Sequence, residues 1–220
     1  MPDLNFEIEG AEPLRYAMAP QLNFKLRIRD AAEAEAVPIP AVALRCQVRI
    51  EPTRRSYVAA EENRLLDLFG EPSRWDQTLR SMLWTHTSLI VPPFQGQTLV
   101  DLPVPCSYDF NLAVTKCFYA LEDGDVPLSL FFSGTIFYVE EEGGFLQANP
   151  IPWEKEAGYR LPIRVWREMM EIYYPNCAWL CLRKDVFDQL YSYKSRLGLP
   201  TWEQAVEHLL LAASGERVEP

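Results

Sequence analysis

The sequence predicts an α+β protein: an antiparallel β-sandwich or a strongly twisted sheet of about eight strands, with helices packed on it. Three observations support this fold class. Strand-like segments recur through the first 158 residues, three of them alternating apolar and polar side chains, a helical pattern interrupts them near residues 58–83, and apolar residues after Tyr159 recur at helical spacing. We expect a β-rich part, 1–158, and a helical extension, 159–220, packed on one core as a single domain overall.

Three segments near the N-terminus alternate with a period of two, which is typical of strands with one buried face. Their apolar members are Leu4, Phe6 and Ile8, then Leu22, Phe24, Leu26 and Ile28, then Leu44, Cys46, Val48 and Ile50. The side chains between them are mostly polar or charged. The pattern predicts three antiparallel strands with solvated outer faces, and a surface loop at 31–40.

A short helical insertion is expected after the third strand. Val58, Leu65, Leu66 and Phe69 fall on one helical face, and Gly70 stands where a left-handed helix cap belongs. Ser73 with Asp76 resembles a capping pair for a second short helix. The apolar residues of that second helix are Trp75, Leu79, Met82 and Leu83. We expect the insertion to cap one end of the sheet.

Strand signals return between residues 84 and 105, but prolines interrupt them. Pro92, Pro93 and Pro103 cannot donate to a strand ladder, so these segments are predicted to be edge strands. A further strand is expected over Phe145–Ile151, after a turn at 140–144.

The run from Tyr108 to Val139 predicts a long β-hairpin. Two β-type stretches flank Glu122-Asp123-Gly124-Asp125, and the Asp-Gly pair in this turn tolerates positive φ. From Ser129 to Val139 both faces are apolar or aromatic, which predicts a strand that is covered on both sides.

Three helices are expected after Tyr159. Pro162 suits a first helical position. An apolar stripe at helical spacing follows it, formed by Ile163, Trp166, Met169, Met170 and Tyr173. A short strand is expected at 178–182, and a helix over Asp185–Leu197 with its apolar side facing inward. Thr201 and Gln204 form a capping box that starts the last helix.

Charge and composition limit the classes of partner and the location. The formal net charge is −10, which disfavours nucleic acids and anionic membranes because their binding needs clustered Lys and Arg. The sequence has no apolar run of the ~20 residues that a membrane helix needs and no signal-peptide pattern. Five cysteines without framework spacing suit reduced thiols. We therefore predict a cytoplasmic protein.

No catalytic, cofactor-binding or metal-binding residue is predicted. Cys177 and Cys181 are four residues apart, but no second pair accompanies them, so they are expected to be buried structural thiols. Cys106 is expected to be the most exposed thiol. The sequence contains neither a nucleophile elbow nor a phosphate-binding glycine loop.

The residues with the strongest interaction chemistry are aromatic. Trp84 and Trp153 are the kind of side chain that anchors protein interfaces, and His86 lies two residues after Trp84 without an acidic neighbour. These three residues are predicted as interaction residues for a protein partner.

Four segments mark the chain: RCQVRIEP at 45–52, LLDLFGEP at 65–72, VPCSYDF at 104–110 and LPTW at 199–202. In them it resembles an uncharacterised bacterial family, a domain of unknown function common in actinobacteria. Members of that family are often encoded beside genes for nickel-iron hydrogenases of the high-affinity, oxygen-tolerant sort. The resemblance implies an accessory or maturation-linked role, with hydrogenase subunits as expected protein partners, and it carries over no catalytic residue.

Two alternatives stay open. The order of elements is similar to that of the export chaperone SecB, which implies a holder of unfolded or immature chains. An enzyme with a carboxylate-based site in a sheet-end cleft would gather two or more of Asp101, Asp109, His86 and Glu154. The leading prediction is a non-enzymatic accessory protein, and the sequence leaves open whether it forms a homo-oligomer.

Overall fold

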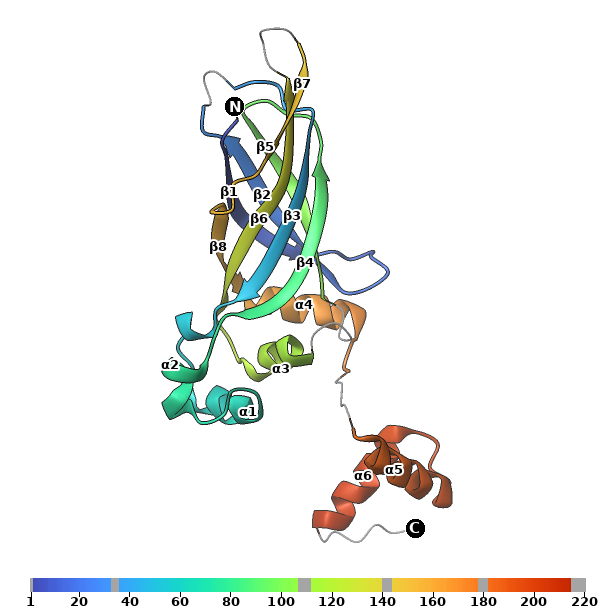
Figure 1. The fold of residues 1–220 in the computed structure, drawn as a ribbon. Coiled ribbons are helices and arrows are strands. Elements are labelled where there is room, and N and C mark those ends of the chain that lie inside the picture. The colour runs from blue at the N-terminus through green and yellow to red at the C-terminus, as the bar shows by residue number, and fades with distance from the viewer. Residues whose placement is uncertain (1, 33–35, 107–111, 140–143, 178–181, 215–220) are drawn as a thin grey trace. The chain divides into compact units, whose positions relative to one another are not determined.

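The computed structural model describes residues 2–32, 36–106, 112–139, 144–177 and 182–214, and it divides into two units, 1–176 and 177–220. Within the described residues it has eight strands in two antiparallel sheets and six α-helices (Figure 1). The predicted α+β class with an antiparallel, sandwich-like sheet is therefore confirmed.

The first unit contains both sheets. One sheet has the order β1-β2-β5, and the other has the order β4-β3-β6-β7 with β8 also paired to β6. The strands are β1 (Leu4–Pro13), β2 (Gln21–Asp30), β3 (Ala41–Ile50), β4 (Met82–Val91), β5 (Gln97–Pro105), β6 (Asp125–Val139), β7 (Leu146–Pro150) and β8 (Glu156–Pro162). β4 and β5 each pair with one neighbour, as the proline argument predicted for edge strands.

The core lies between the inner faces of the two sheets. The residues of β2 at 22, 24, 26 and 28 are completely buried, and their polar neighbours are not, so the period of two predicted the strand and its face correctly. Phe6 of one sheet stacks on Phe132 of the other, with ring centroids 4.4 Å apart. Aromatic stacking of this kind adds to the apolar burial that holds the layers together.

The first half of the predicted 108–139 hairpin is wrong. Residues 107–111 lie outside the described residues, and Leu112–Ala120 form helix α3. Val114, Cys117, Phe118 and Leu121 are buried, at the spacing i, i+3, i+4 and i+7 of one helical face. Gly124 does take a positive φ of 81°, but its turn joins a helix to β6.

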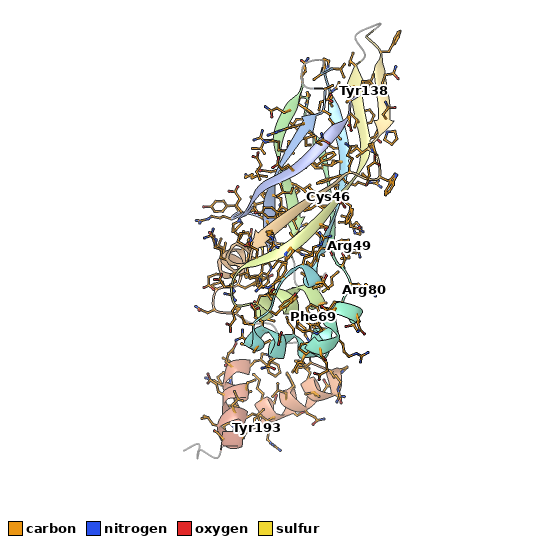
Figure 2. The ribbon with its side chains drawn as sticks, turned by 90° about the vertical axis from the view of Figure 1, so that its left-hand side faces the viewer. Cys46, Arg49, Phe69, Arg80, Tyr138 and Tyr193 are labelled. Carbon is orange, nitrogen blue, oxygen red and sulfur yellow. The ribbon has the colours of Figure 1, made fainter. Side chains whose placement is uncertain are left out.

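Four helices gather at one end of the sheets (Figure 1). They are α1 (Ala59–Phe69), α2 (Trp75–Thr78), α3 and α4 (Ile163–Tyr173). In Figure 2, Phe69 lies among these helices, and Tyr138 lies at the opposite end of the sheets. Gly70 ends α1 as predicted and donates its N–H to the Leu66 carbonyl, but its φ of 73° and ψ of −160° lie outside the left-handed helical region, so the predicted αL cap is not formed. Of the predicted apolar face, Leu65 is buried, whereas Val58 and Leu66 are exposed.

The predicted second helix of the insertion is only partly correct. α2 stops at Thr78, and both Met82 and Leu83 belong to β4. Ser73 does not cap it, because Pro72–Arg74 form a 3-10 turn that leads directly into α2. Trp75 anchors this corner instead: its ring is buried and its Nε1 donates to the Gly70 carbonyl at 2.9 Å.

A buried ion pair ties α1 to the turn before β6. Glu61 Oε1 accepts from Arg55 Nη2 at 2.7 Å and from the Glu122 backbone N–H at 2.8 Å. Arg55 also donates to the backbone carbonyls of Asp123 and Asp125, at 2.7 and 2.9 Å. Because these groups are buried, their mutual hydrogen bonds offset the cost of taking two charges out of water.

From Phe131 onward β6 is covered on one face and not on both. Phe132, Ile136 and Tyr138 are buried, whereas the outer-facing Phe131, Phe137 and Val139 are only half-buried; before this point the outer-facing Pro127 and Ser129 are buried as well. The expectation of double coverage is therefore wrong, because no second layer lies over this part of the outer face in the described residues.

The change from strand to helix comes at Ile163, since β8 runs on to Pro162. The predicted stripe of α4 is confirmed, with Ile163, Trp166, Met169 and Met170 all buried. The predicted strand at 178–182 falls mostly on residues outside the described ranges. No helix in the part of the chain that the structure describes is long and apolar enough to span a membrane.

The second unit contains α5 (Lys184–Arg196) and α6 (Trp202–Ser214). The Gln204 backbone N–H donates to Thr201 Oγ1 at 3.2 Å, which confirms one of the two hydrogen bonds of the predicted capping box. The inward-facing side of α5 is not confirmed, because Val186 and Leu197 remain about two-fifths exposed at 38% and 44%.

Candidate functional site

A hollow of about 800 Å³ lies on the outer face of the larger sheet, over β4, β3 and β6. The side chains that point outward into it form two rows across the strands. One row is Ser88, Arg45 and Ser133, and the other is His86, Gln47 and Phe131. Trp153, from the loop between β7 and β8, completes the lining.

Strand periodicity decides which side chains reach the hollow. Leu44, Cys46 and Val48 are buried between the sheets, so Arg45 and Gln47 must face outward. Figure 2 shows Cys46 midway along this strand. The antiparallel register then places the outward residues of β4 and β6 directly beside them.

Gly134 explains why an aromatic residue overhangs this part of the sheet. β6 pairs with β8 up to Phe131 and with β7 from Thr135 onward. At the change of partner Gly134 has φ of 137°, and a Cβ there would lie 1.9 Å from the Ala43 carbonyl oxygen. Only glycine fits such a backbone. The 151–155 loop leaves the sheet at this point and carries Trp153.

Two backbone hydrogen bonds hold that loop. The Ile151 N–H donates to the Gly134 carbonyl and the Phe132 N–H donates to the Lys155 carbonyl, both at 2.9 Å. Between these anchors the Trp153 side chain is 89% exposed. The loop therefore presents a large apolar ring beside the hollow on a backbone that is fixed at both ends.

The hollow combines one cation with uncharged hydrogen-bonding groups. Arg45 is the only fully charged residue that lines the hollow. Among the described residues, its guanidinium makes no hydrogen bond or ion pair. The Gln47 amide nitrogen lies 3.0 Å from His86 Nε2. This contact holds the two side chains beside each other on the sheet face, and both can hydrogen-bond to a ligand. The site is therefore rich in donors and suits a ligand that offers acceptors.

The structure brings together two of the three predicted interaction residues. His86 and Trp153 both line the hollow. Trp84 lies in the core, 5% exposed, with its ring 5.1 Å from that of Phe118. A register shift opposite Val48 and Arg49 leaves Trp84 as an extra residue in β4, and this bulge turns its side chain inward.

Among the described residues, no carboxylate of the predicted cluster lies with His86 in the hollow. Asp101 lies on β5 of the smaller sheet, where its Oδ1 is 2.7 Å from Lys25 Nζ. Neither Asp101 nor Glu154 is among the described residues that line the hollow. Asp109 lies outside the described residues.

The thiols are distributed differently from the prediction. Cys106 is buried, its Sγ donates to the Val104 carbonyl at 3.3 Å, and burial raises its pKa to about 12. Burial raises the pKa of Cys46 and Cys117 to about 12 as well. Cys177 is exposed, which corrects the expectation of a buried thiol, and Cys181 lies outside the described residues.

No group of three or more His, Cys, Asp or Glu side chains among the described residues is arranged to share a metal ion. Arg45 and Phe131 were missed from sequence, since strand alternation marks them as outward-facing but cannot show that they are neighbours. The neighbouring strands decide that, and their pairing is a tertiary property.

Comparison with known proteins identifies a family whose function is unknown. The model of DUF6084, a family of unknown function, matches residues 1–218. A search of the curated proteins finds no match.

Two solved structures show weak similarity. The CARDB domain of the PF1109 protein from Pyrococcus furiosus, in complex with di-metal ions, has 8% identity and a TM-score of 0.27, over 73% of this chain and 92% of that one. A beta-glucosidase from Kluyveromyces marxianus has 11% identity and a TM-score of 0.24, over 72% of this chain and 15% of that one. Both TM-scores are too low for either likeness to bear on fold or function.

Proposed function

This chain belongs to DUF6084, a family of unknown function, and we propose that it is a non-enzymatic accessory protein that binds a protein partner through the outer-face hollow. The observation that carries the proposal is the pairing of an exposed Trp153 with Arg45 in one hollow. Trp and Arg are the residue types that most often dominate binding energy at protein interfaces.

The open shape of the site favours a protein segment over a small molecule. Small-molecule sites usually bury most of the ligand in a cavity. Here the floor is a sheet face, and Arg45, His86 and Trp153 are all exposed. A segment lying across β4, β3 and β6 would cover the Trp153 ring and exclude water from Arg45.

The chemistry of the lining defines the segment. Arg45 offers a fork of N–H donors, and the Ser88 and Ser133 hydroxyls lie on either side of it in the same row. A carboxylate would satisfy these donors, and an apolar neighbour would pack on Trp153 and Phe131. The net charge of −10 repels a long acidic tract. We therefore propose a segment with a single carboxylate flanked by apolar side chains.

Hydrogenase subunits are the first partners to test, because the resemblance noted from the sequence implies a role beside nickel-iron hydrogenases. This assignment of the partner is separate from the assignment of the hollow. Each part is tested with its own probe.

Binding to an array of synthetic peptides tests the hollow. The full chain should retain peptides with one carboxylate between apolar residues, and both Arg45→Glu and Trp153→Ala should weaken binding by about 10- to 100-fold. Matched controls are Arg29→Glu, an exposed arginine of the smaller sheet, and Tyr16→Ala, an aromatic residue that is 98% exposed. Both controls should bind as the unchanged chain does.

Equal binding by Arg45→Glu and Arg29→Glu would refute the hollow as the binding site, as would equal retention of basic peptides. Purified hydrogenase large and small subunits form the second probe. If the peptides with one carboxylate between apolar residues bind and these subunits do not, the proposed partner is wrong, and the assignment of the hollow as the binding site stands.

A further inference from the structure

The helix pair of the second unit has almost no interior of its own. Among its described residues, Ala205 is the only buried apolar side chain. Helices of 13 residues are marginal in water and depend on packing of an apolar face. The contacts between α5 and α6 therefore do not account for their stability.

The pair exposes a large apolar surface. Nine large apolar side chains of the unit are at least 36% exposed. Trp202, Val206, Leu209 and Leu210 follow the i, i+4, i+7, i+8 spacing of one face of α6. The Phe187 and Tyr191 rings of α5 lie 5.2 and 6.0 Å from the Trp202 ring and extend that face.

We propose that α5 and α6 dock on the same two helices of a second copy of this chain, in a two-fold symmetric four-helix bundle. A large side chain has about 150–250 Å² of surface, so nine of them leave on the order of 700 Å² exposed. A stable dimer buries about 800 Å² on each partner. The exposed surface therefore matches what a second copy would cover.

The charges of the two helices are complementary across a two-fold axis. Arg183 and Lys184, at the start of α5, are already paired with Asp185 and Asp188 of the same helix, whereas Lys194 and Arg196 at its end have no ion-pair partner among the described residues. α6 contains Glu203 and Glu207 and has no Lys or Arg. In the proposed bundle α5 of one copy lies against α6 of the other, so that Lys194 and Arg196 meet Glu203 and Glu207 at the rim.

Sedimentation of the full chain tests the proposal. At high concentration we expect a species of twice the chain mass of 25.4 kDa. Leu210→Lys should raise the dimer dissociation constant by about 100-fold, because symmetry places the substitution in the interface twice. The matched control is Leu146→Lys on β7, since Leu146 is 62% and Leu210 64% exposed. This control should remain a dimer.

Hydrogen exchange of the unchanged chain gives a second, independent readout. Amides of α5 and α6 should exchange more slowly as concentration rises. The proposal is overturned if the chain is a monomer at every concentration, or if the amide exchange rates of α5 and α6 do not depend on concentration. Either result would assign the apolar face to the first unit or to a different protein. Dissociation by Leu146→Lys but not by Leu210→Lys overturns it as well.

Discussion

The two units of this chain differ in how they bury their apolar side chains. The sheet unit buries complete strand faces, such as residues 22, 24, 26 and 28 of β2, between its own layers. The helix pair buries Ala205 and leaves the Trp202 face open. Because stability depends mainly on apolar surface removed from water, the first unit can be stable by itself and the second depends on a further surface.

The difference also separates the two proposed activities. The hollow with Arg45 and Trp153 is a small polar and aromatic site on a finished fold. The α5–α6 face is a large apolar surface on a unit that buries little apolar surface of its own. A rigid sheet can hold a recognition site in place, whereas an exposed helix face is an interface whose partner completes the core.

The largest effect expected within the sheet unit comes from Glu61→Ala. It leaves the Arg55 guanidinium buried without its counter-charge, so the free energy of unfolding of the first unit should fall by about 3–5 kcal/mol. Urea denaturation followed by the fluorescence of the buried Trp84 and Trp166 measures this loss.

Asp67→Ala is the matched control, since it removes an exposed ion pair with Lys116 from the same helix. Its cost should stay below about 0.5 kcal/mol. The contrast between the two units fails if Glu61→Ala changes hydrogen exchange in α5 and α6 as strongly as in the sheets.

Gly134→Ala should lower the free energy of unfolding by about 3 kcal/mol. The added Cβ would meet the Ala43 carbonyl oxygen, and the positive φ is strained for alanine. Gly158→Ala on β8 is the control, because nothing lies within 4 Å of its Cβ position, and it should change stability by less than about 1 kcal/mol. A mild Gly134→Ala phenotype would show that β6 does not need this backbone to change partners.

Thiol labelling should distinguish the two units by the reaction rates of their cysteines. Cys177 of the second unit is exposed, so it should react readily with a disulfide reagent at pH 8. Cys46, Cys106 and Cys117 are buried with pKa values raised to about 12, so they should react at least 1,000-fold more slowly. Cys177→Ser should remove one fast equivalent, and fast reaction of Cys106 would contradict the buried core.

Burial of these thiols also sets a direction for the pH dependence. The unfolded chain loses their protons near pH 9 and the folded chain near pH 12. The unfolded state therefore binds fewer protons between these values, and stability should fall as pH rises through this range.

Several elements could be predicted from local patterns. β1, β2 and β3 follow from alternation, α4 from its apolar stripe, and the end of α1 from Gly70. α3 was misassigned because Val114, Thr115, Phe118 and Tyr119 favour strands individually. The helical spacing of the buried Val114 and Phe118 was present in the sequence, but the β-type composition of the segment outweighed it.

The candidate site was only half predictable. Trp153 and His86 were identified by residue type, and Trp84 was assigned to the wrong environment because a bulge in β4 reverses its face. Arg45 and Phe131 join the site only through the pairing of β3 with β4 and β6. A single-residue shift in register exchanges the two faces of a strand, and short-range patterns do not reveal such a shift.

By itself, the amino-acid order determined which segments are strands with one apolar face, where α1 ends and α6 begins, and that charge disfavours nucleic-acid partners. Those properties depend on neighbours within a turn or two of the chain. The tertiary structure alone decided that Arg45, His86 and Trp153 meet on one sheet face, that Cys106 is buried, and that Ala205 is the only buried apolar side chain among the described residues of the helix pair. These depend on contacts between residues far apart in sequence, where register, bulges and layer packing select among locally equivalent arrangements.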